Sequence, residues 1–307
     1  MAMKILRCAP GRFICKAVFA WLGVVVAAGA VRAETAVKFT AHYIITMTHV
    51  TVGEMNWTAN LSDTSYFSSA TGKASGVLSV LVKGEGSLTT RGAFANARLM
   101  PATARFDVSD DDGVYELEMT FEDGVYKRVV DHGAPPPEDR LPVGPSLLHD
   151  VIDPLSAFLI PVEGKALVPA NCGKVLKIFD GRRRYDLALS YKRMDTVKLA
   201  RGYSGQVLVC GVVLRPLAGY RPGSLLVRYL AGKDDLELWL APIPGASVIA
   251  PVRALMPTLV GTMDISADEF VARAIEVAPA APAKAVDVAP PAPAKPVEVA
   301  PLAPLKP

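Results

Sequence analysis

The chain has 307 residues, 51% of them hydrophobic and 21% charged, which is enough apolar material to bury a sizeable core. Its formal net charge of +3 depends on the first 33 residues, which hold five of the 33 Lys and Arg and none of the 30 Asp and Glu. The rest of the chain carries 28 basic and 30 acidic residues, so it offers no polycationic face for nucleic acid.

Residues 1–33 are typical of a secretory signal peptide. Four cations precede an apolar run of 15 residues, Ala17 to Val31, and Ala33 ends a small-residue cleavage pattern. The run is shorter than the roughly 20 residues that cross a bilayer. We therefore expect cleavage, export to the periplasm and no membrane span in the exported chain. Retention of this segment as a single-span anchor is the alternative.

Residues 37–130 predict antiparallel strands. One strand pair surrounds residues 52–54, and strands at 77–82 and 87–90 flank a loop that contains glycines. The clearest unit is a meander over residues 104–130, in which apolar and polar side chains alternate between glycine-containing turns. This alternation is typical of a sheet with one buried and one solvated face.

Residues 132–145 contain five prolines and therefore predict a surface loop. Beyond this loop, Ser146 is expected to cap a short helix over residues 147–152. Asp153, with proline next in the chain, is expected to cap a second one over residues 155–159.

Residues 174–192 predict a β-hairpin, because apolar side chains alternate along them and Asp180-Gly181 supplies a turn. A two-residue loop would place Lys177 opposite Arg184, which is a like-charge pair. A four-residue loop over 180–183 avoids this pair, so we expect that register. It sets Ile178 opposite Tyr185, Leu176 opposite Leu187 and Lys177 opposite Asp186.

Strand signals continue through the last third of the folded part. The capping-box spacing at Ser266 to Glu269 then predicts a short terminal helix. The expected strands cover residues 206–214, 224–230, 236–240, 248–256 and 258–265.

From Ala278 the composition reduces to Ala, Pro, Val and Lys with scattered acids. Residues 281–290 recur with small changes as residues 292–301. Such a sequence cannot bury a core, so residues 278–307 are predicted to be a disordered spacer reaching roughly 90 Å at about 3.1 Å per residue.

Four cysteines occur, and two of them, Cys8 and Cys15, belong to the signal peptide. Cys172 and Cys210 remain in a compartment where thiols oxidise, so we expect a disulfide between them. Two buried free thiols are the alternative. The spacing supports neither a redox motif nor a zinc cluster.

No catalytic or metal site is predicted. The four histidines, His42, His49, His132 and His149, lie in different elements without metal-ligand spacing. Ser146, His149, Asp150 and Asp153 lie within eight residues, and capping accounts for Ser146 and Asp153 more simply than a catalytic triad. The aspartates at 110–112 lack the spacing of a calcium loop.

Arg182, Arg183 and Arg184 form a cationic cluster. In the expected register, Arg182 and Arg183 lie at an exposed hairpin tip and Arg184 begins the second strand. We predict an anion contact there, with an anionic lipid head group or a polysaccharide. A solvated tip without a ligand is the alternative.

Several turn and strand motifs resemble the domain-of-unknown-function 3108 family of exported bacterial proteins. The resemblance covers about residues 38–265, and no activity is assigned to that family, so it supplies no catalytic residue. It implies an exported protein built mainly from antiparallel strands. The motifs are Asp153-Pro-Leu-Ser156, Cys172, Phe179-Asp-Gly-Arg182, Tyr185-Asp-Leu187, Cys210 and Pro216-Leu-Ala-Gly-Tyr220.

We interpret residues 34–277 as one mainly β domain, a curved antiparallel sheet that forms a barrel or half-barrel with one or two short helices. Strand edges in so strand-rich a chain must be closed or covered, which favours curvature. Two domains that divide near residues 133–145 are the alternative.

The expected function is that of a non-catalytic protein of the cell envelope that holds an apolar or amphipathic ligand, such as a lipid, in its concave face. Strands at 43–50, 77–82 and 207–214 are apolar on both faces, so they need a second layer or a ligand. An envelope assembly or scaffold factor that docks a protein or a glycan, with the tail as spacer, is the alternative. A hydrolytic enzyme ranks third, and no cofactor is predicted.

Overall fold

A computed structural model describes residues 34–75, 84–110, 113–132, 139–164 and 167–277. The predicted signal peptide, the predicted strand at 77–82 and the predicted disordered tail lie outside these ranges. Within them, no helix is both long and apolar enough to cross a bilayer.

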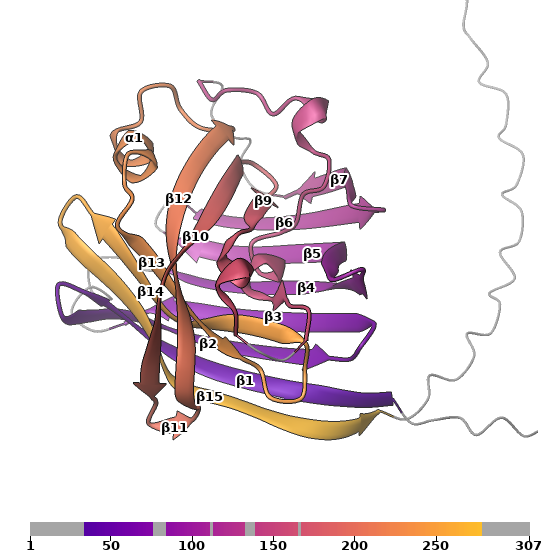
Figure 1. The fold of residues 1–307 in the computed structure, drawn as a ribbon. Coiled ribbons are helices and arrows are strands. Elements are labelled where there is room, and N and C mark those ends of the chain that lie inside the picture. The colour runs from indigo at the N-terminus through magenta and orange to yellow at the C-terminus, as the bar shows by residue number, and fades with distance from the viewer. Residues whose placement is uncertain (1–33, 76–83, 111–112, 133–138, 165–166, 278–307) are drawn as a thin grey trace, which may run out of the picture. The chain divides into compact units, whose positions relative to one another are not determined.

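The described strands form one antiparallel, open and curved sheet, as the sequence predicts (Figure 1). Along the sheet the order is β7-β6-β5-β4-β3-β2-β1-β15-β14-β13-β12-β10-β9, so β1 and β15 join strands from both halves of the chain. The strands are β1 Glu34–Met47, β2 Val50–Leu61, β3 Ser65–Ala74, β4 Glu85–Ala95, β5 Arg98–Asp110, β6 Gly113–Glu122, β7 Val125–Asp131, β8 Ile160–Pro161, β9 Val175–Phe179, β10 Arg184–Lys198, β11 Arg201–Gly202, β12 Ser204–Ala218, β13 Leu236–Pro242, β14 Val248–Thr258 and β15 Gly261–Val277.

Strands β1 to β7 form a meander, which includes the predicted unit over 104–130 as β5 to β7. The predicted turn at 52–54 is wrong, because those residues lie within β2 and the chain turns at Thr48 and His49. In β2, Trp57, Ala59 and Leu61 are buried, while the residues between them face the other side. The hairpin of β9 and β10 has the predicted four-residue loop, and all three predicted cross-strand pairs are present, including Ile178 with Tyr185.

A segment without regular structure connects the two ends of the strand path. Val125 of β7 forms a β-bridge with His149, and Ile152 forms a parallel bridge with Ile178 of β9. The Ile152 amide donates to Lys177 O at 2.9 Å, so residues 148–152 lie between the two outer strands.

This arrangement explains why the predicted helix over 147–152 is wrong. The backbone groups of the segment bond to two strands and cannot also bond to one another. Single turns of 3₁₀-helix at Pro145–Leu147 and Ser156–Phe158 take the place of the two predicted helices. A third 3₁₀ turn, at Pro169–Cys172, was not predicted.

Two further predictions fail near the C-terminus. The predicted strand at 224–230 is helix α1 (Leu225–Ala231), whose Ser224 side chain accepts from the Val227 amide. The predicted helix at Ser266 is part of β15, because Ser266 pairs with both Arg253 and Ile44 of neighbouring strands. Pairing on both sides of β15 outweighs the local capping signal.

Hydrophobic side chains cover both faces of β12. Val207 and Val209 belong to the largest core, with Phe39, Trp57 and Phe270, while Leu208, Cys210 and Val212 belong to a second core. The apolar faces of this strand are therefore covered by protein. A ligand is not needed to explain residues 207–212.

Candidate functional site

The predicted disulfide is present. Cys172 ends the third 3₁₀ turn and Cys210 lies in the middle of β12, with both side chains fully buried and the Cα atoms 5.5 Å apart. The bond ties the long connection that precedes β9 to a central strand of the sheet.

The three arginines are placed differently from the exposed tip that the sequence predicts. Arg182 has a side chain only 17% exposed and forms a bidentate pair with Asp131 of β7, at 2.9 and 3.0 Å. Arg184 is buried and donates to Leu147 O and to Asp186. Arg183 is the exposed member, 3.1 Å from Asp180. The predicted exposed tip is therefore wrong for Arg182, whereas Arg184 begins β10 as predicted. Both side chains attach the hairpin to other parts of the chain, and the anion contact stays a prediction.

The grouping of Ser146, His149, Asp150 and Asp153 does not converge into a site. Ser146, His149 and Asp150 are exposed, and Asp150 pairs with Arg98 at 3.0 Å. Asp153 is fully buried and points elsewhere. Its capping role is confirmed, because its Oδ1 accepts from the amides of Leu155 and Ser156 at 3.0 and 2.9 Å.

Asp153 lies at the centre of a buried polar cluster with Ser156, Thr90 and Tyr66. Thr90 Oγ1 donates to Asp153 Oδ2 at 2.9 Å, Ser156 Oγ donates to the same oxygen, and Tyr66 Oη lies 2.9 Å from Ser156 Oγ. All four residues are at most 3% exposed. Burial raises the pKa of the Asp153 carboxyl above its ordinary value of 3.8.

The cluster holds a turn against the sheet. Its hydroxyl and carboxyl groups bond to one another, and the cluster connects the 3₁₀ turn at 156–158 to β3 and β4. Gly92 makes room for it, because a Cβ there would lie 2.6 Å from Tyr66 Oη and 2.3 Å from Met100 O. Of the four residues, Thr90 contributes to the lining of a hollow of about 250 Å³, together with residues such as Phe67 and Arg105.

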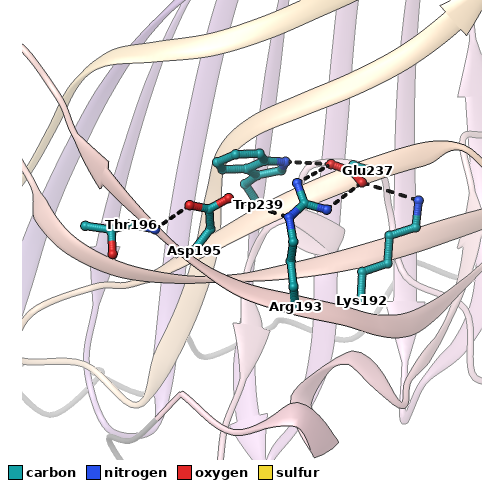
Figure 2. Close-up of polar contacts among 6 residues, drawn as sticks. All are labelled: Lys192, Arg193, Asp195, Thr196, Glu237 and Trp239. Carbon is teal, nitrogen blue, oxygen red and sulfur yellow. Dashed lines mark hydrogen bonds and ion pairs between the residues drawn. The ribbon is translucent and has the colours of Figure 1, made fainter.

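A second cluster, which we call the Glu237 cluster, lies on one face of β10, β12 and β13 (Figure 2). Glu237 accepts from Arg193 through both oxygens at 2.8 and 3.0 Å, from Trp239 Nε1 at 3.1 Å and from Lys192 at 3.4 Å. The Arg193 hydrogen bonds lower the pKa of Glu237 to about 2. Gly211 of the intervening strand leaves the space that Lys192 crosses.

Two guanidinium groups flank the indole of Trp239. The Arg193 and Arg253 guanidinium carbons lie 5.3 and 5.2 Å from the ring centroid, within the range of cation–π attraction. Arg253 also pairs with Asp264 of β15 at 3.0 Å. Asp195 lies 3.5 Å from Arg193, so three carboxylates match the three cations of the cluster across β10, β13, β14 and β15. The arrangement therefore stabilises the sheet.

A polar hollow of about 500 Å³ lies over β2 to β5. Its side chains come from strand positions that face away from the main core, with carboxylate, amide, hydroxyl and amino groups among them. Lys73 donates to Glu54 at 2.9 Å, which lowers the pKa of that carboxyl. The polar side chains are Glu54, Asn56, Thr71, Lys73, Glu85, Ser87, Asp107 and Ser109.

An apolar hollow of about 330 Å³ lies on the opposite face of the same strand segments. Its apolar side chains continue the core face of the same strands, where Met55 lies two positions from the buried Trp57. The lining also includes Ile45, Val52, Ala74 and Val108 and the glycines Gly53, Gly72, Gly84 and Gly86.

Sequence reasoning treated these glycines as punctuation between strands. Gly53, Gly72 and Gly86 lie inside β2, β3 and β4, and Gly72 pairs directly with Gly86. Glycine within a strand often marks the close approach of a ligand or another backbone, which is the signal that could have located this hollow.

Of the comparisons with known proteins, the family model agrees with the resemblance that the motifs predict. No curated protein matches the chain. A crystal structure described as a beta-barrel-like protein of domain of unknown function DUF1849 from Brucella abortus is 11% identical, with a TM-score of 0.43, and the match covers 77% of this chain and 98% of that one. The model of the DUF3108 family, described as protein of unknown function, matches residues 38–268. The chain therefore belongs to the DUF3108 family.

Proposed function

We propose that this chain is a non-catalytic binding protein of the cell envelope that holds an apolar or amphipathic ligand, such as a lipid, in the apolar hollow. The observation that carries the proposal is the hollow itself, about 330 Å³ at the ends of β2 to β5. The middle of the same concave face is filled by large side chains such as Trp57 and Leu159. The proposed ligand site is therefore confined to the strand ends.

Gly72 supports a ligand because the fold does not require glycine there. A Cβ at Gly72 would meet only Glu54 O at 3.6 Å, an ordinary contact, whereas a Cβ at Gly86 would lie 3.3 Å from Asp107 O, so the backbone at Asp107 would have to shift slightly. Neither residue has a positive φ. Glycine within a strand weakens the strand. Glycines that leave a hollow there are therefore expected where a ligand occupies the space.

The polar hollow does not extend the apolar one, because its side chains lie on the opposite face of β2 to β5. An amphipathic ligand would place its tail against Ile45, Met55 and Val108 and keep its head in solvent beyond the strand ends. Ligand sites usually have a predominantly apolar lining of this kind.

The first experiment is organic extraction of the purified protein followed by mass spectrometry, with a parallel Gly72→Val/Gly86→Val variant. We expect the wild-type protein to yield a bound amphiphile and the variant to yield at least tenfold less, because the added methyl groups occupy the hollow. Ser69→Val is the matched control, since Ser69 lies in β3 on the opposite face.

Equal recovery from the wild-type protein and the double variant would exclude the hollow as the ligand site. The absence of any extracted ligand, together with no uptake of a fluorescent fatty-acid probe, would exclude the function. Circular dichroism would establish that each variant is folded.

A further inference from the structure

Two turns lie side by side at one end of the sheet, and we call them the paired turns. The first joins β1 to β2 at Thr48 and His49, and the second joins β14 to β15 at Leu259 and Val260. The Thr48 amide donates to Thr262 O at 3.1 Å. Both turns lie at the left end of the sheet in Figure 1.

The paired turns expose large aliphatic side chains. Leu259 is 60% exposed, Val260 is 75% exposed and Val50 is 48% exposed. Gly, Asn, Asp and Ser normally occupy such positions, because they suit turn geometry and water. Leucine and valine at the centre of a two-residue turn therefore need another explanation.

The turn does not depend on these two side chains for its shape. Thr258 Oγ1 donates to Gly261 O, and the Val260 amide donates to Thr258 Oγ1 at 3.3 Å. Gly261 has a φ of 128°, which favours glycine. Thr258 and Gly261 thus set the geometry, and the exposed Leu259 and Val260 remain available for an external contact.

The surroundings of the paired turns are uncharged over a long distance. Residues 43–53 and 254–263 contain no Asp, Glu, Lys or Arg, although these four types make up 21% of the chain. Three half-buried methionines, Met47, Met256 and Met263, lie behind the exposed residues. Apart from the exposed polar residues Thr48, His49, Thr51 and Thr262, this end of the sheet is an apolar tip on a chain that is otherwise rich in charge.

Helix α1 adds the residue types that favour a membrane interface. Tyr229 Oη donates to Thr258 O at 3.0 Å, and the Lys233 amino group lies 4.7 Å from the Tyr229 ring centroid. Tyrosine and lysine are favoured at the level of lipid head groups. The acids Asp234 and Asp235 follow Lys233, so the helix does not present a net positive charge.

From these observations we propose that the paired turns insert into the surface of a lipid bilayer and dock the protein there reversibly. Two arguments favour lipid over a protein partner. The exposed residues are aliphatic, whereas the centres of protein interfaces are enriched in Trp, Tyr and Arg. The turn also satisfies its own hydrogen bonds through Thr258, which reduces the cost of leaving water.

This docking surface goes beyond the ligand proposed above and does not depend on it. Ile45 and Val52, which line the apolar hollow, belong to the same hairpin as the first turn. A protein that exchanges an amphiphile with a bilayer would place the hollow and the docking tip at one end. The two proposals have separate readouts, because docking is measured on vesicles and ligand binding by extraction.

The test is flotation of the full chain, purified after export, with vesicles of pure phosphatidylcholine and of phosphatidylcholine with phosphatidylglycerol. The variant Leu259→Ser/Val260→Ser removes the tip. Leu141→Ser/Val175→Ser is the matched control, because those residues are also aliphatic and are 48% and 49% exposed. All variants share one N-terminus, so any contribution from that segment is constant.

We expect the wild-type protein and the control to float with both kinds of vesicle, at 50 mM and at 500 mM salt alike. The partition coefficient of the tip variant onto vesicles should be at least about tenfold lower, because two aliphatic side chains are lost. In Leu259→Trp, the tryptophan emission should shift to the blue on vesicle addition. The proposal is overturned if the wild-type protein does not float, if the tip variant floats equally, or if flotation needs anionic lipid at low salt.

Discussion

Asp153 shows how one side chain can be both a cap and a charge in the core. Its Oδ1 accepts from two backbone amides and its Oδ2 accepts from two hydroxyl groups, so the carboxylate is well bonded. Complete burial still raises its pKa, because desolvation penalises the charged form. The stability that this residue contributes is therefore greatest below pH 3.8 and is lost as the pH rises through the raised pKa.

Replacing Asp153 separates the two roles. Asp153→Asn keeps the acceptor for the amides and removes the titration, so its unfolding free energy should depend less on pH than that of the wild-type protein. Asp153→Ala removes the acceptor and should cost about 1–3 kcal/mol at every pH. Urea denaturation between pH 4 and pH 8 measures both. Identical pH profiles for the wild-type protein and Asp153→Asn would show that the carboxyl keeps its ordinary pKa.

Strand β12 is the element on which the second half of the sheet depends. It separates two cores, carries the disulfide at Cys210 and has Gly211 where the side chains of β10 and β13 meet. A Cβ at Gly211 would lie 3.0 Å from Lys192 Cε. The composition of one strand thus determines whether the Glu237 cluster can form.

Glu237→Gln tests the cluster through pH. The pKa of Glu237 is lowered to about 2, so its stabilising contribution is present above pH 4.5 and is lost between pH 4.5 and pH 2. The variant should therefore be less stable than the wild-type protein by about 1–2 kcal/mol at pH 7, with no difference near pH 2. Guanidinium denaturation at both pH values measures this, with the exposed Glu118→Gln as control. A constant difference across the pH range would contradict the ion-pair interpretation.

The strand glycines allow a prediction about β3 alone. If Gly72 is kept for a ligand and not for the fold, Gly72→Val should raise the stability of the ligand-free protein by about 0.5–1 kcal/mol. Thermal unfolding of delipidated protein is the measurement. A loss of stability would mean that the packing of β3 itself requires glycine.

At the scale of the whole sheet, three long-range fastenings hold the curvature of residues 34–277. The segment at 148–152 bonds to β7 and β9, Arg182 pairs with Asp131, and the disulfide ties the long connection to β12. Each of these contacts joins parts of the chain that are distant in sequence. Each also involves either the connection before β9 or the β9–β10 hairpin. We therefore expect these long-range contacts to break at a lower denaturant concentration than the hydrogen bonds between neighbouring strands.

Cys172→Ser/Cys210→Ser removes the covalent fastening. The disulfide closes a loop with a sequence separation of 38, so its loss should lower stability by about 2–4 kcal/mol. Denaturation of the variant, and of the wild-type protein under reducing conditions, should give the same decrease. If only the variant is destabilised, packing of the serines and not the lost link is the cause.

The sequence by itself determined the local pairing of this protein. Alternation gave the strands of the meander, a like-charge conflict chose the register of the β9–β10 hairpin, and proline after Asp153 marked the cap. The same level of reasoning placed the disulfide, because only Cys172 and Cys210 remain after residue 33. These features depend on neighbours in the chain, whose chemistry can be read directly from the sequence.

Only the tertiary structure decided which distant segments meet. It bonded residues 148–152 to β7 and β9 and made the capping-box segment at 266–269 part of β15, because backbone groups there pair with strands far away in the chain. It gave Arg182 a partner 51 residues away and placed the turn at 259–260 beside the turn at 48–49. The hollow and the tip that carry the proposed functions arise from such contacts, since neither exists until the curved sheet brings its strand ends together.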